Sequence, residues 1–184
     1  MAEFPLKEAV RGRNVQIIWM PFELRPDPVP TLDPNGAYLR DAWKNSVYPF
    51  AARMGVEMKL PQVSPQPRTR LALEGLEFAK AHGAGEAYHT AVMQAFFQRS
   101  ENIGDVEVLT VLAAGVGLDA DSFRVALHNG TYAAHTAGLL RVATEEMEIH
   151  GVPLFLIGDV ALSGVQSRET LQQVIDQQLE KAPE

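Results

Sequence analysis

The 184-residue sequence contains no cysteine. Disulfide bonds and metal centres held by thiolates are therefore excluded for this chain, and so is every reaction in which the chain itself supplies a thiolate nucleophile. The absence fits an oxidising or a reducing compartment equally well, because it removes structural disulfides without requiring reducing conditions.

Long apolar runs and an excess of positive charge are also missing. The longest apolar stretch, residues 108–116, is about half of the ~20 residues that a membrane helix needs, so no membrane span is expected. A formal charge of -7 and a pI near 5.2 argue against a nucleic-acid partner, because such binding depends on clustered Lys and Arg. Residues 1–8 have neither the basic start nor the apolar middle of a secretory signal, so a cytoplasmic location is expected.

Familiar catalytic and metal-binding motifs are absent as well. No Gly-x-Ser-x-Gly elbow or phosphate-binding loop occurs, and no two histidines have the i, i+4 spacing of a helical metal site. We therefore expect no metal and no resident cofactor. An acidic group could indicate general acid–base chemistry, but glutamates late in a helix are more typical of a solvated face; its members are Glu145, Glu146, Glu148 and Asp159.

What is present is a pattern of helices placed between two strand-like regions. Residues 14–24 are rich in β-branched and aromatic side chains and predict a strand, and proline-rich connectors follow at 25–34 and 61–67. Helical periodicity then predicts helices over about 34–55, 69–82, 86–98, 106–116, 122–128 and 131–149. Residues 152–157 and 160–163 predict a hairpin around Gly158-Asp159, and residues 167–182 a closing helix capped by Ser167.

Four aromatic residues have two interpretations. Trp19, Tyr38, Trp43 and Tyr48 could line a ligand cleft between the helices and the sheet, or they could be core residues. Aromatic side chains at these spacings are more often part of the core. The order of elements predicts one α/β domain with a helical insertion between its sheet elements.

Several phrases, in the right order, carry a family resemblance. HGVPLFLIGDVALSGVQSRETLQQVI (150–175) is similar to the closing module of DsbA-type thioredoxin-fold proteins, and TRLALEGLEFAK, AYHTAVMQAFF, NIGDVEVLTVLAAGVGLD and FRVALHNGTYAAH resemble the helical insertion of their FrnE-like branch. The resemblance covers about residues 14–180. It implies a thioredoxin-like core, incomplete at its N-terminus, over residues 1–32 and 149–184, with a helical insertion subdomain over 33–148.

The sequence also departs from this family. A family member opens with a strand and a Cys-x-x-Cys motif at the start of a helix, whose dipole stabilises the thiolate. Neither is found here, and the resemblance places the absent strand between residues 14–24 and the strand near Leu154. We expect one of three outcomes: the two strand edges pair directly, a partner chain supplies a strand, or the sequence is a shortened form of a longer protein.

The resemblance implies thiol–disulfide oxidoreductase activity for the family, which a cysteine-free chain cannot perform alone. In related isomerases and transferases a serine replaces the thiol and glutathione supplies the sulfur, but that residue also belongs to the absent segment. The alternative is a non-catalytic assembly module that binds an extended peptide or glutathione, and we expect a dimer. The resemblance implies a cis Pro153, and the substrate-binding residues would be Gly151, Val152 and Pro153. No catalytic residue is assigned.

Overall fold

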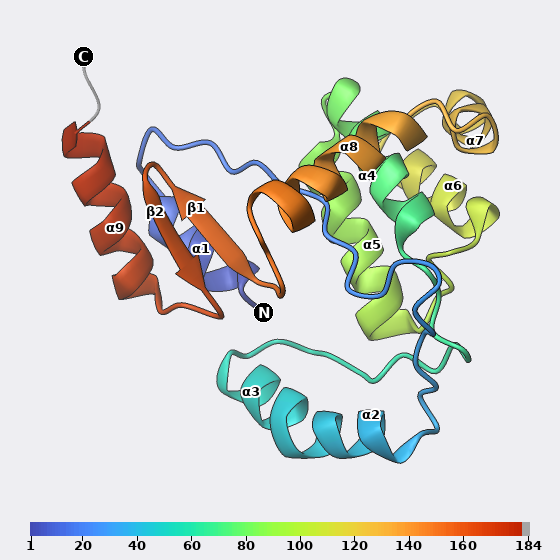
Figure 1. Cartoon of the computed structure of the whole chain (residues 1–184), viewed down its shortest axis with the longest axis horizontal. Helices are drawn as coiled ribbons and strands as arrows, with labels where there is room; N and C mark the ends of the chain where they lie inside the picture. Colours follow the sequence, from blue (N-terminus) through green and yellow to red (C-terminus); the bar gives the residue numbers. More distant parts are fainter. Residues whose placement is uncertain (182–184) are drawn as a thin grey trace. The chain divides into compact units, whose positions relative to one another are not determined.

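A computed structural model describes residues 1–181. The chain forms two compact units, one made of residues 1–18 with the chain from Met147 onward, the other of Trp19–Glu146. Both are drawn in Figure 1. A helical unit is thus inserted between the two ends of the chain that build the sheet-containing unit, as the element order predicts.

In the described residues, the first unit contains one hairpin and two helices. Strands β1 (Leu154–Ile157) and β2 (Val160–Ser163) pair antiparallel, with Leu154 opposite Ser163 and Ile157 opposite Val160. Gly158 has a φ of +58°, a conformation that glycine adopts without the steric cost of a side chain, which explains the tight turn. The predicted hairpin is confirmed.

Helices α1 (Glu3–Val10) and α9 (Arg168–Lys181) pack against each other beside this hairpin. Their shared core consists of Ala9, Phe155, Leu171 and Ile175. Arg13 Nε and Nη2 donate to the two carboxylate oxygens of Asp176 at 2.6 and 2.9 Å and connect the segment after α1 to α9. The predicted end of the last helix, Ala182, lies outside the described residues.

The strand predicted over residues 14–24 is wrong. This segment is extended, and from Val15 to Trp19 half-buried residues alternate with exposed ones, as in a strand. A strand also requires a hydrogen-bonded neighbour, however, and in the described part of the chain β1 pairs only with β2. Direct pairing of the two edges is therefore not observed.

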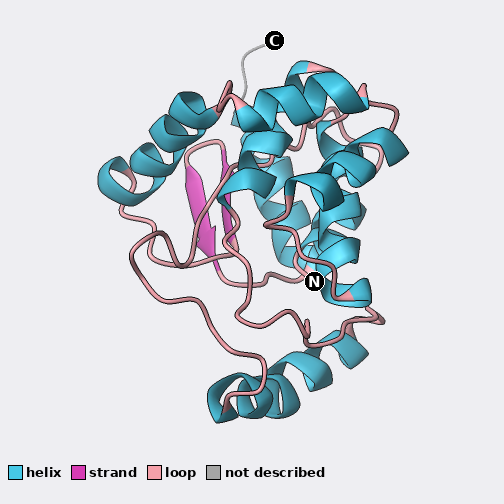
Figure 2. Cartoon of the chain, turned by 90° about the vertical axis from the view of Figure 1, so that its right-hand side faces the viewer, coloured by secondary structure: helices cyan, strands magenta, loops and turns pink. Residues whose placement is uncertain are grey.

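The second unit is helical. Helices α2 (Ala37–Ala42) and α3 (Tyr48–Arg53) continue through a π-helical turn, η1 (Trp43–Val47), which confirms the helix expected near 34–55. The remaining helices are α4 (Arg70–Ala81), α5 (Gly85–Arg99), α6 (Val106–Gly115), α7 (Ala120–His128) and α8 (Ala133–Arg141), followed by the π-helical turn η2 (Val142–Glu146). Figure 2 shows how strongly helices dominate the structure.

The core of this unit lies between α4, α5, α6 and α7. Tyr88, Leu109 and Phe123 are fully buried in it. The side chains of Asp105 and Asp119 accept backbone N–H groups at the starts of α6 and α7, as N-cap residues do. The sequence therefore predicts both the apolar stripes and the helix starts correctly in this region.

Candidate functional site

The loop before β1 places the three predicted binding residues at the surface. Gly151 and Val152 are exposed, Pro153 is half-buried, and the Val152–Pro153 peptide bond is cis, as expected. Pro153 O accepts the backbone N–H of Gly164 at 2.9 Å, which extends the pairing of β1 and β2 by one residue pair. The loop is therefore held in line with the hairpin.

The register determines which backbone groups of β1 are open. Hydrogen-bonded pairs alternate in an antiparallel ladder, so the Pro153–Gly164 bond places Phe155 and Ile157 in bonded pairs with β2. The N–H and C=O groups of Leu154 and Leu156 consequently face away from β2. No other strand in the described residues pairs with that edge, so these groups can accept an added extended segment.

The side chains of β1 point to two different environments. Phe155 is buried against α1 and α9, whereas Leu156 is 53% exposed on the opposite face. Val152 is 50% exposed. Exposed apolar side chains next to an open strand edge are the features that strand addition uses, with the backbone giving affinity and the side chains giving selectivity.

The acidic group seen in the sequence does not form an acid–base site. Asp159 is bound to α9: it accepts Gln178 Nε2 at 2.6 Å and lies 3.4 Å from Lys181 Nζ. These two contacts, the Gln178 hydrogen bond first, lower the pKa of Asp159. Its carboxylate therefore stabilises the hairpin turn, while Glu145, Glu146 and Glu148 are exposed.

The histidines have separate contacts. His82 Nδ1 lies 2.8 Å from Phe78 O, and His135 Nε2 lies 3.5 Å from Glu77 Oε2. The rings of His89 and Trp19 are stacked, with their centroids 4.2 Å apart. Within the part of the chain that the structure describes, no three His, Asp or Glu residues converge as a metal site would require.

The aromatic residues do not line one cleft. Trp43 is buried and contacts Tyr48 edge-on, and the Tyr48 hydroxyl accepts the Leu60 N–H at 3.1 Å. Trp19 stacks on His89, and Tyr38 is 69% exposed. The interpretation as a core residue is confirmed for Trp43 but not for Tyr38. The sequence contains no signal that tells the buried Trp43 from the exposed Tyr38.

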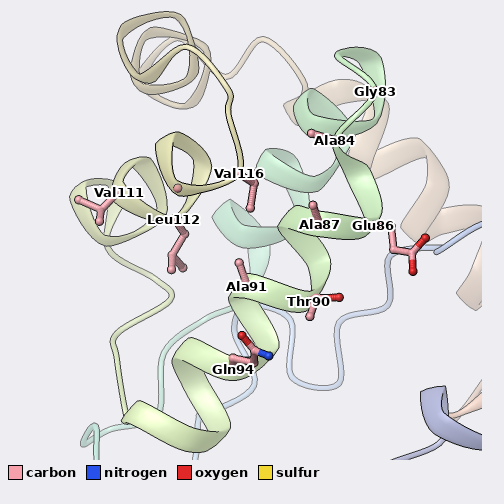
Figure 3. A pocket seen from close by; sticks show the side chains of 11 residues that line it. Gly83, Ala84, Glu86, Ala87, Thr90, Ala91, Gln94, Val111, Leu112 and Val116 are labelled. Carbon is pink, nitrogen blue, oxygen red and sulfur yellow. The ribbon is translucent and has the colours of Figure 1, made fainter.

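The helical unit also has an open groove of about 720 Å³ between α5 and α6. Small and apolar residues such as Ala87, Ala91 and Val116 form most of its wall, together with Thr90 and Gln94 (Figure 3). The groove is lined by no histidine, lysine or serine, and its one titratable residue is Glu86. This groove therefore has room for a ligand but few side chains that could bind or react with it specifically.

Sequence reasoning missed a set of buried charges in this unit. Glu23, Glu74 and Glu77 are almost fully buried. Burial raises the pKa of Glu74, the positive charge of Arg70 opposes this rise, and Glu23 adds to it. The available signal was the position of Glu74 and Glu77 within the apolar stretch of α4, where charged side chains are uncommon unless paired.

Comparison with known proteins assigns the chain to a class. The family model described as DSBA-like thioredoxin domain matches residues 1–176, and the chain belongs to this family. This is a thioredoxin fold with a helical insertion, and the expected family and fold class are confirmed. None of the described helices is long and apolar enough to cross a membrane.

The chain is also similar to one curated protein and to solved structures. The uncharacterized protein YwbO of Bacillus subtilis is 45% identical over 176 residues, which cover 95% of this chain and 88% of that protein. A crystal structure of a probable DsbA oxidoreductase from Streptomyces coelicolor superposes with a TM-score of 0.79 at 22% identity, covering 100% of this chain and 85% of that one. A crystal structure from Nitrosomonas europaea superposes with a TM-score of 0.65 at 16% identity, and the match covers 80% of this chain and 77% of that one. At these identities the two structures show the fold alone.

Proposed function

We propose that this chain is a DsbA-type thioredoxin-fold protein that binds extended polypeptides and does not exchange disulfides by itself, although its family is one of thiol–disulfide oxidoreductases. The observation that carries the proposal is the combination of this family with a sequence that has no cysteine. Exchange begins when a thiolate attacks a disulfide sulfur and forms a mixed disulfide, and no atom of this chain can take that role. Glutathione or another small thiol would have to bring its own sulfur.

The proposed binding site consists of Gly151, Val152 and Pro153 with the open edge of β1. An extended polypeptide would form backbone hydrogen bonds with the outward N–H and C=O groups of Leu154 and Leu156. Its apolar side chains would contact Val152 and Leu156, both of which are about half exposed.

Insulin reduction by added dithiothreitol tests the inactivity of the chain. We expect the rate of insulin precipitation to equal that of the protein-free reaction, with a thioredoxin-fold dithiol catalyst as the positive control. Turnover above the protein-free rate would falsify the requirement for a cysteine supplied from outside this chain.

Backbone binding is tested with reduced and alkylated insulin chains as the probe. Leu156→Pro removes one outward N–H without removing a bond to β2, because this residue faces the open edge. Leu156→Ala is the matched control, since it shortens the same side chain but keeps the N–H.

We expect the probe to shift the amide resonances of Val152 and residues 154–156 in the unaltered chain. Leu156→Pro should weaken binding by about tenfold more than Leu156→Ala, which is the value of one good hydrogen bond. The hairpin amides of each variant show whether β1 and β2 still pair. If the probe moves resonances elsewhere and leaves those of Val152 and residues 154–156 unchanged, the site is wrong.

A second candidate is a non-catalytic binding or assembly module, favoured by the absence of cysteine together with an open strand edge. Calorimetric titrations with glutathione and with the alkylated insulin chains separate a small-thiol site from a peptide site. Absence of heat in both titrations contradicts both binding versions.

Other assignments belong to the same proposal. The core over residues 1–32 and 149–184, the insertion over 33–148 and the FrnE-like branch are supported by the quoted sequence phrases. Dimer formation is supported by the open edge of β1, which a second copy could cover, and is tested by sedimentation of the Leu156→Pro variant. A cytoplasmic location is part of the same proposal.

A further inference from the structure

A second, smaller cavity of about 220 Å³ lies within the helical unit. Its apolar wall consists of Pro26, Ala137 and Leu140. Its polar groups come from three separate segments, namely the extended chain before α2, the first residue of α4, and α8 with η2; they are Glu23, Arg70, Arg141 and Thr144. Ligand pockets typically combine an apolar wall with a few polar groups in this way, although most have volumes above about 300 Å³. The size therefore restricts the occupant to a small molecule.

Glu23 and Arg70 form one ion pair in the lining of the cavity. The Glu23 side chain is only 4% exposed, and its Oε2 accepts Arg70 Nη2 at 2.7 Å and Arg70 Nε at 3.1 Å. Both of these bonds end on the same carboxylate oxygen. Within the described residues no hydrogen bond to Glu23 Oε1 or from Arg70 Nη1 is found. A buried carboxylate is stabilised by additional donors, so Glu23 Oε1 can accept one from a ligand.

The local charge favours a donor near Glu23. Glu74 lies one helical turn after Arg70 on α4 and is also buried, so a single guanidinium faces two carboxyl groups. An ammonium group placed beside Glu23 Oε1 would supply the missing positive charge and a hydrogen-bond donor.

Arg141, the last residue of α8, adds a positive charge to the lining of the cavity. Its guanidinium has no hydrogen bond or ion pair within the described residues, and it lines the cavity together with Thr144. Thr144 Oγ1 already donates to Leu140 O at 2.9 Å, so toward a ligand it can only accept. A planar guanidinium with no partner is suited to binding a carboxylate through two hydrogen bonds.

We propose that this cavity binds a small amphipathic carboxylate of the amino-acid type. Arg141 holds the carboxylate, Glu23 Oε1 and Thr144 Oγ1 accept hydrogen bonds from the ammonium group, and an aliphatic side chain contacts Pro26, Ala137 and Leu140. None of the residues of this cavity belongs to the proposed binding site at the β1 edge. The two proposals can therefore be tested separately.

L-leucine is the probe, and two analogues each remove one charged group: 4-methylpentanoate has no ammonium group and isoamylamine has no carboxylate. Binding is followed by amide resonance shifts and calorimetry on the whole chain. We expect leucine to move resonances of residues 23–26 and 137–144, and both analogues to bind about tenfold more weakly or worse, as the loss of a charge-assisted hydrogen bond implies.

Arg141→Gln tests the carboxylate contact, and Arg53→Gln, which changes an arginine stacked over Phe50 on α3, is the matched control. We expect Arg141→Gln to weaken leucine binding by about tenfold or more and Arg53→Gln to leave it unchanged. Because Arg141 has no partner in the described residues, its replacement should not unfold the chain. The proposal is overturned by any of three results. These are resonance shifts that do not saturate with leucine, equal affinity for leucine and 4-methylpentanoate, or unchanged leucine affinity in Arg141→Gln.

Discussion

Glycine at position 75 permits the closest packing in the helical unit. A Cβ atom on Gly75 would collide with the Tyr88 hydroxyl and the Phe123 ring, and both of those side chains are fully buried. Gly75→Ala should therefore lower the free energy of unfolding by about 1–3 kcal/mol, as overpacking of a core does. Urea denaturation measures the change.

The matched control is Gly138→Ala on α8. A Cβ atom there would meet no atom within 4 Å, and the position is inside a helix. Alanine should stabilise the chain at this position by up to about 1 kcal/mol because it restricts the unfolded chain and favours the helix. Equal effects of both substitutions would show that helix propensity, rather than the contact with Tyr88, decides the outcome at Gly75.

Glu74 makes stability depend on pH. Burial raises its pKa in the folded chain, so folding favours the protonated form. The stability contributed by neutral Glu74 is fully present below the ordinary glutamate pKa and is lost as the pH rises through the raised folded value. Glu74→Gln, which cannot ionise, should therefore be more stable than the unaltered chain at pH 7, with a smaller difference at pH 4.

Thermal unfolding at the two pH values measures this difference, and Glu145→Gln on the exposed surface is the control. The interpretation fails if Glu74→Gln is the less stable protein at pH 7. That result would mean that attraction between Glu74 and Arg70 outweighs the cost of burying the carboxylate.

At the scale of single elements, the sequence predicts the helices better than the strands. Helix periodicity and caps are local, and they correctly locate α4 to α7 and the caps Asp105, Asp119 and Ser167, whose Oγ accepts the Thr170 N–H at 3.1 Å. A strand depends on a partner that is distant in the sequence. Residues 14–24 have the composition of a strand, but they pair with no other strand within the described residues. Composition alone does not reveal that lack.

The candidate sites differ in the same way. The Gly151–Pro153 loop is contiguous, and its predicted position before β1 is observed. The cavity between Glu23, Arg70 and Arg141 unites residues more than 100 positions apart in the sequence. The packing of α4, α8 and the segment before α2 brings these residues together, and no local sequence pattern predicts it.

The N-cap of α6 shows how much a local signal contributes. Asp105 Oδ1 accepts Glu107 N at 2.8 Å and Val108 N at 3.2 Å. Asp105→Ala should lower the free energy of unfolding by about 1 kcal/mol because two N–H groups at the helix start lose their acceptor. Denaturant titration measures the loss. Asp121→Ala, inside the first turn of α7, is the control and should change stability by less than about 0.5 kcal/mol.

At the scale of the whole molecule, the two ends of the chain form one core and the middle forms another. Ala9 of α1 packs with Phe155, Leu171 and Ile175, while the large cluster around Tyr88 and Leu109 draws its buried members only from residues 72–127. Because the two clusters have no residue in common, their local opening is expected to be partly independent.

Leu171→Ala tests this independence. Leu171 is fully buried in the small core, and removing its side chain should cost about 2–5 kcal/mol. Hydrogen exchange should then accelerate in α1, β1, β2 and α9 but not in α4 to α7. Leu109→Ala in α6 should produce the reverse pattern, because Leu109 is equally buried in the other core. If Leu171→Ala accelerates exchange to the same extent in α4 to α7, the two cores open as one cooperative structure, and the β1 edge would then share the stability of the helical unit.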